Sequence, residues 1–335
     1  MSLGKREGTP KRSKYGGLYG FVLLALAIVS PNAWACTISP NISAAFGSVN
    51  SFVIESSPQN TSAQPSAGAV CQGALLGLAV TSNQRIRATL NSTNQGRLVN
   101  IENNDAIPYR IFALASQNEQ MFLGTAYNYF NPVLIDLLGL IGGQNINIPM
   151  EFRTLPTTNV AAGMYTDTLT INWNWRICDI GLLGICLART GTGTTTINLS
   201  IMVTPDCAIQ APDLDFGSAP LVAGFDTVSR TIDITCTKGS DYSVGLSDGQ
   251  HAAGNVRRME GGGQYLNYQL YKGTTGNSRW GNGGSERRAS STADTNPGTP
   301  SGSSQGFTYR AEILPGQSTP PAGTYTDMII VDVAF

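Results

Sequence analysis

An internal repeat constrains the fold of this chain more than any other feature. The segments AAGMYTDTLTINW (161–173) and PAGTYTDMIIVDV (321–333) share the string AGxYTD followed by alternating apolar residues. A Phe-Gly pair also follows an early cysteine at nearly the same distance in each half. Two related domains are therefore expected, covering residues 36–205 and 206–335, and about 300 residues is enough for two domains.

The six cysteines fit the same repeat. They lie at positions 36, 71, 178, 186, 207 and 236. An even number in an exported chain indicates disulfides formed in an oxidising compartment. Pairing equivalent positions of the two copies predicts Cys36–Cys71 and Cys207–Cys236. Cys178–Cys186 then remains to close the segment CDIGLLGIC in the first copy.

The first 35 residues have the pattern of a secretory signal peptide. Basic residues precede the apolar run FVLLALAIVS (21–30), and AWA (33–35) fits the small-x-small cleavage rule. The run is well short of the roughly 20 residues that span a bilayer. We expect cleavage before Cys36, and Trp34 disfavours lipoprotein processing at that cysteine.

Composition indicates an exported β-protein. After the expected cleavage, 16 basic and 21 acidic residues remain, a net charge of −5, and no basic cluster suggests nucleic acid binding. Charged residues make up 13% of the chain, about half the usual share. Apolar residues alternate with polar ones in many short segments separated by polar, glycine-rich turns, which predicts an all-β fold of two sandwiches.

The two copies differ at their ends. In the first copy, the AGMYTD strand is followed by CDIGLLGIC and then by a further strand, TTTINLSIMV (194–203). In the second copy, YTDMIIVDVAF ends the sequence. The second sandwich is therefore expected to lack its last strand and to expose a hydrophobic groove with unpaired edges. Val331, Val333 and Phe335 alternate along this end and are expected to line the groove.

The second copy resembles the spore coat protein U domain, found in subunits of Csu-type archaic chaperone–usher pili. The first copy resembles it more loosely. In the second copy the matching features are Cys207, LDFGS, Cys236, YSVGLSDG, VRRM, LNYQLY, RWGNG and AGTYTDMIIVDV, and in the first they are Cys36, FGS, Cys71, IPYRI and AGMYTDTLTI.

The resemblance implies immunoglobulin-like sandwiches, with the C-terminal one an incomplete pilin domain. Such a domain is completed by the N-terminal strand of the next pilus subunit. The resemblance also implies a periplasmic pilus chaperone and an outer-membrane usher as partners. Because no donor strand precedes Cys36 in the expected mature chain, we expect it to be the tip adhesin of a cell-surface pilus.

Three apolar segments of the first copy have no counterpart in the second, and each contains Leu-Leu-Gly. We call them the apolar fingers. Segment 72–80 is read equally well as a buried core strand. We expect CDIGLLGIC to be unpaired, because seven residues inside a disulfide leave little length for a paired strand. Inserted apolar segments of this kind predict an interaction surface. The residues are Leu75, Leu76 and Leu78 in QGALLGLAV (72–80); Val133, Leu134, Ile135, Leu137, Leu138, Leu140 and Ile141 in NPVLIDLLGLIGG (131–143); and Ile180, Leu182, Leu183 and Ile185 in CDIGLLGIC (178–186).

We therefore expect adhesion to hydrophobic surfaces, including abiotic ones, and promotion of biofilm formation. The single histidine, His251, has no metal-ligand or triad spacing, so neither an enzyme nor a cofactor or metal site is expected. Two alternatives remain. A lectin-like tip would carry Asn, Asp and aromatic residues where these segments carry Leu and Ile, and a structural pilus or coat subunit would need an N-terminal donor strand.

Overall fold

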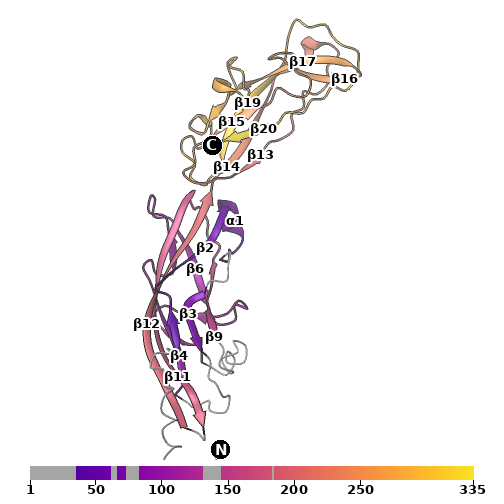
Figure 1. Cartoon of the computed structure of the whole chain (residues 1–335). Helices are drawn as coiled ribbons and strands as arrows, with labels where there is room; N and C mark the ends of the chain where they lie inside the picture. Colours follow the sequence, from indigo (N-terminus) through magenta and orange to yellow (C-terminus); the bar gives the residue numbers. More distant parts are fainter. Residues whose placement is uncertain (1–34, 62–65, 73–82, 131–144, 183–184) are drawn as a thin grey trace, which may run out of the picture.

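The chain folds into two β-sandwich domains, each with its own hydrophobic core. The computed structural model describes residues 35–61, 66–72, 83–130, 145–182 and 185–335, and for Gln72, 178–182 and 185–187 it describes the backbone alone. The first core ends with Val203, and the second begins with Cys207. The two domains lie end to end in an elongated molecule (Figure 1).

In the first domain, a three-stranded sheet, β1-β3-β9, accompanies a larger sheet in the order β10-β6-β5-β11-β12-β2. In the larger sheet, β4 also pairs with β11 and β8, and β7 pairs with β6. The elements are β1 (Cys36–Ile38), β2 (Asn41–Asn50), α1 (Ser51–Ser56), β3 (Ser66–Gln72), β4 (Arg85–Ser92), β5 (Arg97–Val99), β6 (Ala106–Phe112), β7 (Gln120–Met121), β8 (Ala126–Asn128), β9 (Asn145–Pro149), β10 (Glu151–Thr154), β11 (Gly163–Leu182) and β12 (Ile185–Thr204).

The alternation in the sequence sets which side of each long strand is buried. Every second residue of β11 from Tyr165 to Ile177 is buried, and so is every second residue of β12 from Thr195 to Val203. This is the period of two expected where a strand has one face on the core. The two strands, 20 residues each, form a long antiparallel hairpin.

The expectation that CDIGLLGIC is unpaired is wrong. The backbone ladder of the hairpin continues through Cys178↔Ala188 and Ile180↔Leu187 to Leu182↔Ile185, with a register shift between Cys178 and Ile180. The physical reason is that a hairpin needs only a two-residue turn. The seven residues between the cysteines therefore leave room for two short paired arms.

The second domain repeats the plan with fewer strands. Its sheets have the orders β13-β14-β19-β17-β16 and β18-β15-β20. The elements are β13 (Cys207–Gln210), β14 (Val228–Cys236), β15 (Ser243–Leu246), β16 (Arg257–Gly261), β17 (Gln264–Lys272), β18 (Arg288–Ala289), β19 (Gln305–Ile313) and β20 (Val331–Ala334), with 3-10 turns at Val222–Gly224, Gly284–Glu286 and Ser290–Thr292.

The disulfides occupy equivalent places in the two domains. Cys36–Cys71 joins β1 to β3, and Cys207–Cys236 joins β13 to β14. The predicted Cys178–Cys186 bond falls on side chains outside those that the structure describes, so it stays a prediction.

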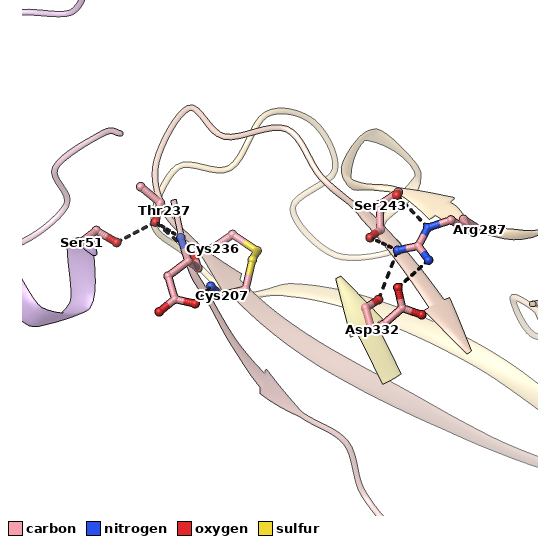
Figure 2. The surroundings of a disulfide bond; sticks show 8 residues. Ser51, Cys207, Cys236, Thr237, Ser243, Arg287 and Asp332 are labelled. Carbon is pink, nitrogen blue, oxygen red and sulfur yellow. Dashed lines mark hydrogen bonds and ion pairs between the residues drawn. A yellow bond between two sulfur atoms is a disulfide. The ribbon is translucent and has the colours of Figure 1, made fainter. Parts of the chain in front are cut away.

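Only two residues separate β12 from β13, and direct polar contacts also join the two domains. The Asn50 side-chain amide donates to the Asp206 carboxylate at 2.7 Å. The hydroxyls of Ser51 and Thr237 lie 2.7 Å apart across the junction (Figure 2). The Lys238 ammonium group forms an ion pair with Asp105, also at 2.7 Å. The junction is therefore a set of specific contacts rather than a free linker.

Candidate functional site

An open groove runs along the core of the second domain. Its volume is about 490 Å³, and it lies between segment 211–216, which follows β13, and segment 325–331, which leads into β20. Its lining includes the side chains of the core residues Ile232, Leu246, Leu270 and Tyr309. The groove therefore gives access to the centre of the sandwich.

The first domain has the same two walls, but a strand lies between them. The repeat aligns β2 with segment 211–220 through their Phe-Gly pairs, and it aligns β11 with segment 323–335 through AGxYTD. In the first domain β12 pairs with both walls, antiparallel to β11 and parallel to β2. In the described part of the second domain, no strand lies between the corresponding walls.

The aspartate of AGxYTD makes the same hydrogen bonds in both domains, which supports the alignment of β11 with segment 323–335. The Tyr109 hydroxyl donates to Asp167 at 2.7 Å, and the Tyr268 hydroxyl donates to Asp327 at 2.7 Å. The other carboxylate oxygen accepts a backbone N–H in each case, from Asn94 and from Gln250. Burial, followed by the hydrogen bond to the carboxylate, raises the pKa of both tyrosines above the ordinary value. The two motifs therefore correspond at a constant offset of 160 residues.

Residues that lie beside β12 in the first domain are more buried than the equivalent residues of the second domain, which lie beside the open groove. Leu169, Ile171 and Trp173 are at most 2% exposed in the first domain. Their counterparts Ile329, Val331 and Val333 are only half-buried. Trp175 is 3% exposed, whereas its counterpart Phe335 is 60% exposed. The second domain thus leaves accessible the side chains that β12 covers in the first.

Of the residues predicted for the groove, Val331 lines it and Val333 packs against the core beside it. Phe335 lies beyond the described lining. Sequence reasoning missed the motif residues Tyr325, Asp327 and Ile329, although adding 160 to the inward positions of β11 would have found them. It also missed the opposite wall, which includes Leu214 and Phe216.

An ion pair holds β20 from the side away from the groove. Arg287 contacts Asp332 of β20 at 2.6 Å and donates to the hydroxyl and the carbonyl of Ser243 at 2.9 and 2.8 Å (Figure 2). The strand β20 also pairs with β15, from Leu246↔Val331 to Ser243↔Ala334. This wall is therefore fixed along one edge while its other edge faces the groove.

A buried arginine supports the same sheet. Arg257 is fully buried and donates to the carbonyls of Ser247, Leu246 and Trp280 and to the Gln269 side chain. Burial, together with the neighbouring Arg279, lowers the pKa of Arg257 to about 10. Its carbonyl partners satisfy the charge and tie the end of β15 to β16, so its role is structural.

The apolar fingers fall largely outside the described residues. This applies to every predicted residue of 72–80 and 131–143 and to Leu183, while Ile180, Leu182 and Ile185 are described by backbone only. The strand residues that flank the fingers are paired with one another. Gln72 pairs with Asn145, and Arg85 pairs with Arg176. The hairpin of β11 and β12 reaches the end of the first domain farthest from the second domain (Figure 1).

No group of three or more His, Cys, Asp or Glu side chains with metal-binding geometry occurs among the residues that the structure describes. Within the same ranges, none of the helices has both the length and the apolar character needed to cross a membrane.

The Spore Coat Protein U domain model matches residues 23–172 and again residues 193–332. Among curated proteins, none matches the chain.

Among solved structures, the chain is similar to the tip adhesion subunit in the CsuC–CsuE chaperone–tip pre-assembly complex of archaic Csu pili from Acinetobacter baumannii. The identity is 25%, the match covers 90% of this chain and 100% of the other, and the TM-score is 0.61. Two other matches are more distant. CfaE, the adhesive subunit of CFA/I fimbria of enterotoxigenic Escherichia coli, is 11% identical over 89% and 93% of the chains with a TM-score of 0.31. The CupB6 tip adhesin of Pseudomonas aeruginosa is 13% identical over 83% and 85%, with a TM-score of 0.28.

Proposed function

The chain belongs to the Spore Coat Protein U domain family, and on this basis we propose that it is the tip adhesin of an archaic chaperone–usher pilus. The similarity to a Csu tip adhesion subunit supports the coarser assignment, a pilus adhesin subunit that passes through the periplasm to a cell-surface pilus. Proteins of this family and fold are pilus subunits rather than enzymes.

The observation that carries the proposal is the open groove of the second domain, whose counterpart in the first domain is filled by β12. An extended strand entering the groove would pair with its unpaired backbone edge and cover the half-buried Ile329 and Val331. In the assembled fibre, the N-terminal strand of the next subunit takes this place. Before assembly a periplasmic chaperone covers the groove, in keeping with the chaperone complex of the related subunit, and the outer-membrane usher exchanges one for the other.

Adhesion is assigned to the apolar fingers of the first domain. Support for a joint role comes from the described residues that flank the fingers, since Gln72 pairs with Asn145 and Arg85 pairs with Arg176. Half-burying about a dozen Leu and Ile side chains contributes on the order of 10 kcal/mol before ordering costs, at roughly 25 cal/mol per Å². Such contacts need no specific chemistry in the target, so hydrophobic and abiotic surfaces are bound and biofilm formation follows.

The adhesion test compares substitutions in the same hairpin. Leu182→Ser with Leu183→Ser is expected to reduce biofilm on plastic while leaving pilus number and the melting temperature unchanged. The control Thr192→Ser with Thr194→Ser alters exposed positions of β12 and should leave adhesion unchanged. Leu199→Ser places a hydroxyl in the core and should abolish assembly. Loss of assembly with the leucine pair, or unchanged adhesion, would place the binding surface elsewhere.

The tip position is tested by imaging an epitope-tagged chain on native fibres. One label at the end of each fibre is expected. Labels spaced along the shaft would indicate a structural subunit instead.

A further inference from the structure

The second family match begins inside the first domain. Its first residue, 193, lies fourteen residues before Cys207. The second matched region therefore includes a segment ahead of its first cysteine. For the second repeat this segment is the second half of β12, which pairs with β11 and β2 of the first domain.

This half of β12 has the form of an inserted strand. Its inward side chains, at alternate positions, are Thr195, Ile197, Leu199, Ile201 and Val203, and each is at most 1% exposed. It fills the slot between β2 and β11, and the corresponding slot in the second domain is the open groove.

We propose that residues 193–204 are the donor segment of the second repeat, used within the chain to complete the first domain. The inference rests on the proposed function, in which the second groove accepts a strand. The two domains are then related as successive subunits of a fibre are, and residues 173–192, which lie outside both family matches, connect them covalently. The contacts of Asn50 with Asp206 and of Asp105 with Lys238 form the joint between two such units.

The proposal requires that the segment also fit the second groove. Ile197 pairs with Leu169 of β11 and with Ile42 of β2, while Leu199 pairs with Asp167 and with Ala44. The equivalent residues of the second domain are found by adding 160 to a residue number of β11 and 170 to a residue number of β2. They are Ile329, Pro212, Asp327 and Leu214, and all four line the open groove.

The register also dictates the test. Trp175 pairs with Gly191, and its counterpart is Phe335. An Asn-Gly turn after Phe335, followed by a copy of residues 191–204, would therefore enter the groove in the register of β12. Two further tails of the same length complete the set. The first control tail carries Asp in place of the copies of Ile197, Leu199 and Ile201. The second alternates Val and Thr, with Val at the positions whose side chains would face the groove. Oligomeric state and the melting of the second domain are measured for the full exported chain.

With the copied tail, the chain is expected to be monomeric, and the second domain should melt higher by on the order of 10 °C. The Asp tail should have neither effect. If the Val–Thr tail stabilises the domain and the copied tail does not, the groove accepts strands but residues 193–204 are not a donor segment. An Asp tail as effective as the copied one would also refute the inference. If neither apolar tail acts, the groove is not an acceptor and the proposed function fails as well.

Discussion

A matched pair of substitutions compares the stability that equivalent core residues contribute in the closed first domain and in the open second domain. Leu169 and Ile329 occupy the same position of the repeat, but Leu169 is fully buried beneath β12 and Ile329 is half-buried at the open groove. Leu169→Ala should destabilise the first domain by roughly 2–5 kcal/mol, the cost of lost burial plus a cavity. Ile329→Ala should cost the second domain about 1 kcal/mol, because solvent already reaches the side chain and no closed cavity forms.

The difference between the costs of the two substitutions should vanish once a strand fills the groove. In the chain carrying the copied tail after Phe335, Ile329 becomes covered as Leu169 is, and Ile329→Ala should then also cost roughly 2–5 kcal/mol. Hydrogen exchange read by mass spectrometry across a urea series resolves the unfolding of each domain separately. Equal costs for the two substitutions in the unmodified chain would mean that the second core is already closed. A cost of Ile329→Ala unchanged by a tail that enters the groove would refute the residue-by-residue equivalence.

Three further predictions concern the rest of the molecule. Peptide mapping without reduction should recover Cys178 linked to Cys186, and a Cys178–Cys71 link would contradict the assignment. Lys238→Gln should change the free energy of unfolding by less than about 1 kcal/mol, because the ion pair with Asp105 is partly exposed. The same substitution should broaden the distribution of distances between spin labels placed on the two domains. An unchanged distribution would mean that this ion pair does not hold the junction. The buried Tyr109 and Tyr268 have folded pKa values above the ordinary value of about 10, so the unfolded state loses these protons first and stability should fall as pH rises past about 10. Tyr268→Phe should reduce that slope for the second domain alone, and an unaltered slope would assign it to other groups.

The sequence predicted the fold well where local pattern decides structure. Strand alternation and the AGxYTD repeat led to two sandwiches, and the position of 194–203 after the motif led to one more strand in the first. The neighbours of that strand could not be read from alternation, because pairing with β2 joins segments about 150 residues apart. For the same reason segment 211–216 was not recognised as a groove wall.

Polar residues were also hard to place from the sequence. Two adjacent arginines read alike, yet Arg257 is buried among carbonyls while Arg258 lies over the Tyr265 ring at 4.2 Å. Only the register of β16 on β17 distinguishes them. The paired backbone of CDIGLLGIC could not be read from its cysteines, because cysteines at both ends of a segment suit a closed loop and a hairpin equally, and here they lie on opposite arms of a hairpin.

The long hairpin also determines how a mechanical load would travel through the molecule. A pull between the far end of the first domain and the second domain acts along β12, one continuous strand from Ile185 to Thr204. A load that enters at β4 passes to β11 and then to β12 through hydrogen bonds that lie across the direction of pull, so these bonds are loaded in shear. Two residues later the force reaches Cys207, where the disulfide to Cys236 shares it covalently with β14.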